Sequence, residues 1–464
     1  MNFTRRNFMK SGAAATLVAG VQPGVWAGTS AAREVSGRPR NVIVLASDGM
    51  SSGTLSFTDQ FLRWRDGRPS HWLALYGQGG VQRGLMDTAS RNNIVTDSAA
   101  AASAWGCGYR VNNGSLNMGP EGEVYEPILV SARRAGKATG LITTATITHA
   151  TPAGFAANVE QRGDEPAIAL QYLEREIDLL LGGGLRHFEA RRRTDGRDVR
   201  ADYQAAGYAY AANTTELQAG AARADRLLGL FASGHIPYEI DRINDSVLSE
   251  RVPSLAEMTR AGLDVLRRRT SGFILQVEGA RVDHAAHAND ASAILFDQIA
   301  FDDAIQVAVE FAAEEPDTLV IITTDHGNAN PGLSSGQDGG EQNFSALNGF
   351  RRSQTELLRQ LDAADTPATI QQKIQEASGI PLTDGEARSM QRQLADEWPT
   401  AYRRMASHRA VLGQLLANHT DIGWVGDAHT SDHVELAAFG PGSAAVKAFS
   451  QNTDLHGLMQ QCLT

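Results

Sequence analysis

The chain has 464 residues, of which 42% are hydrophobic and 20% charged, so it is long enough for one large globular domain or two ordinary ones. Its 42 Lys and Arg residues face 53 Asp and Glu residues, and the resulting net charge of −11 argues against nucleic acid as the main partner. Two cysteines are too few for a disulfide framework or a cysteine-rich zinc module. Any metal site must therefore use histidines and carboxylates.

Residues 1–27 have the features of an export signal. The pair Arg5-Arg6 precedes a short apolar run, Ala13–Val21, in a pattern that bacteria use to export folded proteins. That run is too short to span a bilayer, and Val25-Trp26-Ala27 suits signal peptidase. We predict a twin-arginine signal peptide and a periplasmic or secreted protein, the alternative being an uncleaved anchor. No later stretch is long and apolar enough to cross a membrane.

Short apolar runs rich in β-forming residues alternate with stretches of helical character. This order predicts an α/β fold with three αβα layers and a mostly parallel central sheet. The runs are Asn41–Leu45, Thr139–Thr144, Ile177–Leu181, Phe273–Val277 and Thr318–Ile322. Ligands of such sheets bind at the carboxyl ends of the strands.

The region from about Arg351 to Asn418 is polar, rich in Gln, Arg and Glu, and helical in period. Pro381 and Pro399 are expected to divide it into shorter helices. We predict a helical insertion over about 351–418 that borders the entrance of a site at the sheet edge. The alternative is a solvated helical appendage.

Carboxylates and histidines cluster in the second half of the chain. Asp283 and His287 are four residues apart, so on a helix they share one face and can bind one metal ion, although such a pair is also common as a surface interaction. Glu278 ends an apolar strand, where a carboxylate is costly unless it is paired or metal-bound.

The ends of two other apolar runs carry similar groups. Asp48 follows the first predicted strand, and Asp325-His326 follows the last one. His429 lies further along, before the apolar segment Val434–Phe439. Such oxygen and nitrogen ligands without thiolates suit Zn²⁺ where histidines predominate and Mg²⁺ where only oxygens are present.

Ser98 is the candidate nucleophile. It follows Asp97 and precedes four alanines, which places its hydroxyl at the start of a predicted helix, where backbone N–H groups and the helix dipole favour an anion. The alternative is that either residue serves only as a helix N-cap.

The segment Val95–Ser103 resembles the active-site signature of the alkaline phosphatases, with Ser103 in place of the usual threonine. The similarity covers most of residues 41–350 and resumes at Gly426–Gly442. Further matching motifs are Asn41–Met50, His149-Ala150-Thr151-Pro152, Leu228–Pro237, Phe273–His287 and Thr318–His326. The resemblance implies a catalytic domain over residues 28–464 that hydrolyses phosphate monoesters and forms a homodimer.

The resemblance also implies roles for individual residues. Ser98 would be the nucleophile that becomes phosphorylated, and Arg162 would bind phosphate with its bidentate fork. The implied metals are two Zn²⁺ and one Mg²⁺: Asp283, His287 and His429 for one zinc; Asp48, Asp325, His326 and the Ser98 oxygen for the other; Asp48, Thr151 and Glu278 for magnesium.

His149 and His284 occupy two positions that subdivide the family, and this chain has the double-histidine pattern. We expect both to border the substrate, and an imidazole there to weaken Mg²⁺ at the third site. Cys107 lacks the Cys-x-Pro-x-Arg context of a sulfatase, and its pairing with Cys462 stays open. The rival functions are a phosphodiesterase and a non-catalytic metal- or phosphate-binding protein.

Overall fold

The computed structural model describes residues 37–334, 341–397 and 402–463. The predicted signal peptide therefore lies outside the described residues. Within the described ranges, no helix has both the length and the apolar character that a bilayer crossing requires.

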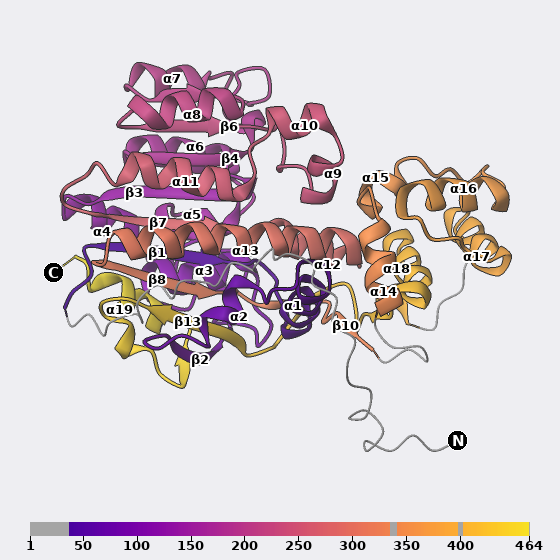
Figure 1. Cartoon of the computed structure of the whole chain (residues 1–464). Coiled ribbons are helices and arrows are strands. Elements are labelled where there is room, and N and C mark those ends of the chain that lie inside the picture. The colour runs from indigo at the N-terminus through magenta and orange to yellow at the C-terminus, as the bar shows by residue number, and fades with distance from the viewer. Residues whose placement is uncertain (1–36, 335–340, 398–401, 464) are drawn as a thin grey trace, which may run out of the picture.

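A ten-stranded sheet forms the centre of the molecule (Figure 1). Its strands run in the order β14 (Phe449–Gln451), β2 (Gln82–Asp87), β13 (Val434–Phe439), β8 (Thr318–Thr323), β1 (Asn41–Ala46), β7 (Phe273–Glu278), β3 (Ala138–Thr146), β4 (Leu179–Gly183), β6 (Leu227–Leu230) and β5 (Ala209–Ala211). Only β13 runs antiparallel to its neighbours β2 and β8. The five strands predicted from apolar runs are β1, β3, β4, β7 and β8, and the predicted α/β class is confirmed.

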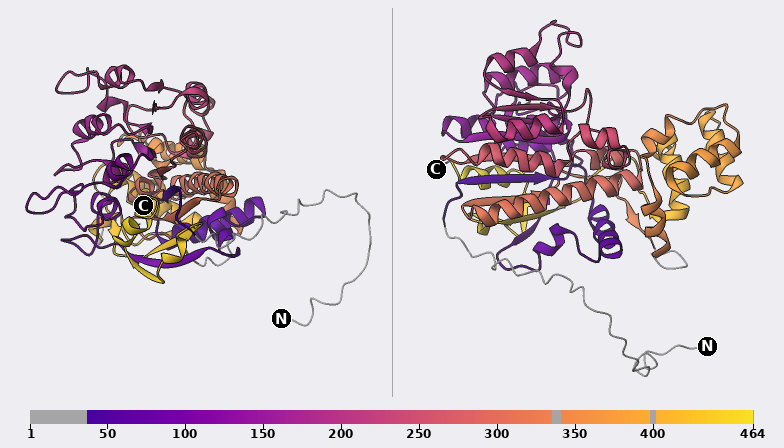
Figure 2. Two further views of the ribbon diagram at one scale, coloured as in Figure 1. Left: turned by 90° about the vertical axis from the view of Figure 1, so that its left-hand side faces the viewer. Right: turned by 45° about the horizontal axis from the view of Figure 1, so that its top comes forward.

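Helices cover both faces of the sheet, as the two views of Figure 2 show. Alternate residues of β1 point to opposite faces, so Ile43 belongs to one apolar core and Val42 to the other. The first core contains α1 (Ser52–Asp66), α2 (His71–Leu75), α8 (Thr214–Arg223), α9 (Glu239–Ile243), α11 (Leu255–Leu266), α12 (Arg281–His287) and α13 (Ala291–Glu314). The second contains α3 (Ser98–Cys107), α4 (Ile128–Arg134), α5 (Ala150–Ala156), α6 (Glu165–Glu174), α7 (Val199–Ala205) and α19 (Asp454–Gln460).

Helices α3 and α5 pack unusually closely. All ten residues of α3 are buried, and most of them are alanine, serine or glycine, which lets the backbones approach. A Cβ atom added to Gly106 would lie 1.9 Å from the carbonyl oxygen of Gly154, and one added to Gly154 would lie 2.5 Å from the Cβ of Ala102. The two glycines thus fix the position of α3, whose first residue is Ser98.

Further helices extend from one end of the α/β body (Figure 1). They are α10 (Ser246–Arg251) from the body and, between β10 (Gly332–Leu333) and β11 (Ile422–Gly423), α14 (Glu341–Gly349), α15 (Gln354–Leu358), α16 (Pro367–Ser378), α17 (Asp384–Leu394) and α18 (His408–Thr420). Strands β10 and β11 pair with each other, so the chain leaves and re-enters the body at one place.

This helical unit is joined to the body by a continuous apolar core. Phe344 of α14 lies 5.9 Å, centroid to centroid, from the ring of Phe61 in α1. The backbone N–H of Gln354 donates to Asp290, the residue that caps α13. The insertion is therefore docked beside the junction of α12 and α13, three residues after His287.

Replacing Gly154 with alanine should destabilise the fold and disturb the site together. The added methyl group would force α3 and α5 apart, and overpacking of this kind costs about 1–3 kcal/mol. We expect a lower unfolding midpoint in urea and a lower kcat/KM on an aryl phosphate. The matched control is Gly457→Ala, because Gly457 is exposed in α19 and nothing lies within 4 Å of its added Cβ. Equal effects of the two substitutions would contradict this account.

Candidate active site

Three adjacent parallel strands bring acidic groups to one edge of the sheet. Strand β1 lies between β8 and β7, and all three end at the same edge. Glu278 is the last residue of β7, while Asp48 and Asp325 each follow their strand by two residues. All three carboxylates are buried, with relative exposures of 0–1%. The sheet itself therefore assembles a set of like charges.

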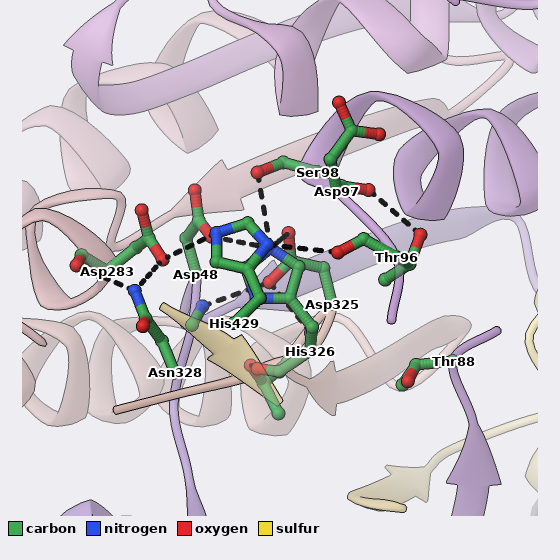
Figure 3. A network of polar contacts seen from close by, with 12 residues as sticks. Asp48, Thr88, Thr96, Asp97, Ser98, Asp283, Asp325, His326, Asn328 and His429 are labelled. Carbon is green, nitrogen blue, oxygen red and sulfur yellow. Dashed lines mark hydrogen bonds and ion pairs between the residues drawn. The ribbon is translucent and has the colours of Figure 1, made fainter. Parts of the chain in front are cut away.

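Histidines reach this edge from other segments. Helix α12 carries His287 one turn after Asp283. His429 begins β12 (His429–Thr430), which pairs with β9 (Gly327–Asn328), so it comes beside His326 although 103 residues separate them. The rings of His326 and His429 stack with their centroids 3.7 Å apart (Figure 3).

The orientation of the His287 and His429 imidazoles leaves one nitrogen of each facing the centre. The Nδ1 atom of His287 lies 2.7 Å from the carbonyl oxygen of Asp427, and that of His429 lies 2.9 Å from the carbonyl of Thr96. A carbonyl only accepts, so each Nδ1 carries a proton, and in the neutral ring each Nε2 then carries the lone pair that can bind a metal. The two Nε2 atoms lie 3.1 Å apart. At that distance the two nitrogens require a proton or a metal ion between or beside them, so the donor set fits a metal ion.

The buried carboxylates also require a nearby cation. Both oxygens of Asp48, Oδ2 of Asp325 and Oε1 of Glu278 are buried without a hydrogen-bond partner in the described part of the chain. Burial, followed by the charges of neighbouring carboxylates, raises the pKa of Asp48 well above its ordinary value. Burial raises the pKa of Glu278 to about 7 although Thr143 donates to it. Divalent cations offset such charge and accept these oxygens as ligands.

Asp283 and His429 polarise each other. Burial alone would raise the pKa of Asp283, but the neighbouring imidazoles outweigh burial and hold it well below its ordinary value. Burial would likewise lower the pKa of His429, yet Asp283, 3.5 Å from Nε2, raises it to about 9. Asn328 donates to the Asp283 carboxylate over 2.7 Å and fixes its orientation.

The structure brings the predicted metal ligands into three compact groups whose members' ligand atoms lie within 4.8 Å of one another. These are Asp283, His287 and His429; Asp48, Asp283 and His326; and Asp48, His149 and Glu278. The first equals the set predicted for one zinc. In the second, Asp283 takes the place expected for Asp325, although Asp325 Oδ2 lies 3.1 Å from His326 Nε2. In the third, His149 joins Asp48 and Glu278, and the hydroxyl of the predicted ligand Thr151 is buried without a partner among the described residues.

Ser98 lies at the centre of this arrangement. It is the first residue of α3, and the side chain of Asp97 caps the helix by accepting the N–H of Ala100. The Ser98 Oγ lies 3.3 Å from His326 Nε2 and its residue is 2% exposed (Figure 3). The other Asp97 carboxylate oxygen accepts from Gly114 N and from Arg162.

Arg162 connects the serine to the predicted substrate histidines. One terminal nitrogen of its guanidinium donates to Asp97 over 3.0 Å, and the other lies 3.3 Å from His149 Nε2. The ring of His149 lies 5.7 Å from that of His284, edge to face. Burial is the main cause that lowers the pKa of both imidazoles, to about 3 for His149, so both are neutral near pH 7.

Several residues that shape the candidate site were not predicted from the sequence. Gly49 adopts φ +67°, and a Cβ there would lie 2.5 Å from an oxygen of Asp283. Asn328 orients Asp283 from a segment 45 residues away, and His235 and Arg281 pack against His284. Cys107 and Cys462 are both buried free thiols.

Comparison with known proteins agrees with this geometry. The family model for alkaline phosphatase matches residues 39–464. The chain belongs to the alkaline phosphatase family. It is 30% identical to alkaline phosphatase 3 of Bacillus subtilis over 428 residues, which cover 90% of this chain and 87% of the relative. It is 32% identical to the alkaline phosphatase of Escherichia coli over 345 residues, 65% of this chain and 73% of that protein.

Solved structures extend the match to the fold. The crystal structure of Thermus thermophilus alkaline phosphatase superimposes with a TM-score of 0.85 at 35% identity, over 97% of this chain and 95% of that one. The protein is therefore an alkaline phosphatase, a metal-dependent phosphomonoester hydrolase, and the predicted family and enzyme class are confirmed.

The effect of Asp48→Asn on stability should change sign when the metal is removed. We expect a chelator to lower the unfolding midpoint of the wild-type alkaline phosphatase, because buried carboxylates then repel one another. After chelation, the free energy of unfolding of Asp48→Asn should exceed that of the wild type by about 1–2 kcal/mol. With metal present, the variant should be less stable than the wild type. Asp317→Asn, at an exposed position, serves as the control. Urea unfolding with and without chelator measures this, and the same order of stability in both states would contradict it.

Proposed function

We propose that this alkaline phosphatase hydrolyses phosphate monoesters through a phosphoserine on Ser98, with two Zn²⁺ and one Mg²⁺ at the sheet edge. The observation that carries the proposal is the Ser98 hydroxyl at the start of α3, beside His326 and among buried carboxylates whose oxygens have no partner in the described chain. Pure binding of a metal or of phosphate requires no such nucleophile.

The residues divide among three metal positions. One zinc would be held by Asp283, His287 and His429; the second by Asp48, His326, Asp325 and the Ser98 oxygen; and magnesium by Asp48, Glu278 and Thr151. At such sites zinc supplies a lowered pKa for an attached hydroxyl and charge stabilisation for a departing oxygen. His149 beside the third group adds a nitrogen where Mg²⁺ prefers oxygen, so we expect activity to depend on added Mg²⁺.

The chain's own groups position the reaction. The Ser98 Oγ attacks phosphorus as the bond to the ester oxygen breaks, and the alcohol departs. Water then cleaves the phosphoserine and releases phosphate. Backbone N–H groups at the start of α3 and the Arg162 guanidinium bind the phosphoryl oxygens, whose charge must be offset in the transition state. Asp97 holds both parts, because it caps α3 and accepts from Arg162.

A phosphodiester presents fewer charged oxygens than a monoester, so Arg162 favours the monoester. A single comparison tests the proposal against a phosphodiesterase and against a binding protein. It uses p-nitrophenyl phosphate and bis(p-nitrophenyl) phosphate, each with and without chelator. The proposal requires chelator-sensitive turnover with strong preference for the monoester. Preference for the diester, or no turnover with metals present, would overturn it.

Ser98→Ala should abolish turnover and leave the fold intact. Loss of the nucleophile is expected to lower kcat on an aryl phosphate by on the order of a thousandfold or more. Acid quenching with ³²P-labelled substrate should trap label on the wild type and none on the variant. The small, buried side chain leaves a minor cavity, so urea unfolding should change little. A variant with near wild-type kcat would rule out the phosphoserine mechanism.

Arg162→Ala should weaken monoester hydrolysis more than diester hydrolysis. A charged bidentate contact contributes about 1.5–3 kcal/mol, which corresponds to a roughly tenfold to hundredfold loss of kcat/KM on the monoester. Arg162→Lys keeps the charge without the fork and should fall between the two. Equal losses on monoester and diester substrates would contradict this role for Arg162.

We further propose that the protein is exported by the twin-arginine route, is cleaved after Ala27, resides in the periplasm or is secreted, and forms a homodimer. Replacing Arg5 and Arg6 with lysine should retain the uncleaved chain in the cytoplasm. Cell fractionation with intact-mass measurement of the N-terminus tests the route. Cleavage and export that persist in the lysine variant would contradict it.

A further inference from the structure

A cavity of about 550 Å³ lies between part of the insertion and the α/β body, beside the active site. Its walls come from the segment after β6, from helices α9 and α10, from the first residue of α12 and from α15 of the insertion. No residue assigned above to metal or phosphate lines it. The cavity is therefore a separate compartment that adjoins the site.

Arg281 forms the inner wall of this cavity. Its guanidinium lies 3.6 Å from the centroid of the Tyr238 ring and donates to His284 Nδ1 over 2.7 Å. Its Nε atom is buried and has no hydrogen-bond partner among the described residues. No carboxylate of the described chain forms an ion pair with it. Its charge acts on the buried carboxylates of Asp241 and Asp297, but neither lies within ion-pair distance, so Arg281 can still bind a further anion.

Two further arginines, Arg351 and Arg352, stand at the outer wall. Both are exposed, and within the described ranges neither forms an ion pair. One nitrogen of Arg351 donates to the backbone carbonyls of Asn348 and Phe350, which leaves its other donors available.

The acidic residues that line the cavity already have partners. Asp241 accepts from the backbone N–H and the hydroxyl of Ser353, and Asp245 accepts from the first N–H groups of α10. Glu356 pairs with Arg359. The three guanidinium groups of Arg281, Arg351 and Arg352 thus face the cavity without a carboxylate partner in the described structure, and the cavity favours an anion.

A row of contacts leads from the nucleophile to this cavity. Arg162 contacts His149, whose ring lies 5.7 Å from those of His284 and His235, and His284 contacts Arg281. His235 itself lines the cavity. His149, His235 and His284 are each partly exposed, so a substrate whose phosphate is bound at Ser98 and Arg162 would extend toward Arg281 over the surface of this row.

We propose that the cavity binds a second anionic group of the substrate, so that the enzyme prefers phosphomonoesters carrying a further phosphate or carboxylate several bonds from the reacting phosphate. This inference rests on the proposed roles of Ser98 and Arg162. The anionic group enters between the insertion and the body, and the insertion thereby sets substrate preference.

The test compares hexyl phosphate with 1,6-hexanediol bisphosphate on the full-length metal-loaded enzyme. The variant Arg351→Gln/Arg352→Gln removes two charges of the cavity and leaves the residues around Ser98 unchanged. Arg388→Gln/Arg409→Gln is the matched control, because both arginines are exposed on the insertion, do not line the cavity and give the same net charge. Alkanediol bisphosphates of two to eight carbons then report the reach of the second group.

We expect the wild type and the control variant to prefer the bisphosphate in kcat/KM, with an optimum of chain length. The cavity variant should lose about three- to thirtyfold of that preference and keep its rate on hexyl phosphate. An unchanged preference in the cavity variant, or an absence of length dependence, would overturn the inference, the latter indicating a free anion rather than a tethered one. Failure to hydrolyse hexyl phosphate at all would instead overturn the proposed function of Ser98.

Discussion

Mutual repulsion among buried donor atoms is the constraint on which the active site depends. Three parallel strands end in carboxylates at one edge, and the Nε2 atoms of His287 and His429 lie 3.1 Å apart. Protein contacts satisfy the outer nitrogen of each imidazole and leave the inner one free. Bound cations offset this charge, since an unpaired buried carboxylate costs several kcal/mol, and without them the raised pKa values of Asp48 and Glu278 show the same repulsion. The arrangement of these side chains therefore favours metal binding.

The fold supplies the rigidity that holds such groups together. Adjacent parallel strands fix Asp48 and Glu278, and the short ladder between β9 and β12 returns His429 to His326 after the insertion. The close packing of α3 on α5 through Gly106 and Gly154 places the Ser98 hydroxyl against the same edge. The insertion is docked to the body through an apolar core that continues that of the body, and its position at the site entrance stays a prediction.

Local sequence patterns predicted the features that local physics determines. Continuous apolar runs identified β1, β3, β4, β7 and β8, and the four-residue spacing of Asp283 and His287 placed both on α12. The pattern missed β2, whose six residues include only two apolar ones in succession, and the edge strand β5, which has only three residues. Asn328 could not be predicted, because it contacts Asp283 from a segment 45 residues away. Arg281 could not be predicted either, because the cavity that it lines forms only where the insertion meets the body. Family resemblance, rather than spacing, indicated Arg162 and Thr151.

The most direct test is anomalous X-ray diffraction from crystals of the metal-loaded enzyme, with data collected above and below the zinc absorption edge. The account predicts one zinc peak among Asp283, His287 and His429, and a second between Asp48, His326 and the Ser98 Oγ. A light-atom site without zinc signal is expected beside Glu278. Zinc peaks outside these side chains, or a fully loaded active enzyme with Ser98 remote from any ion, would contradict it.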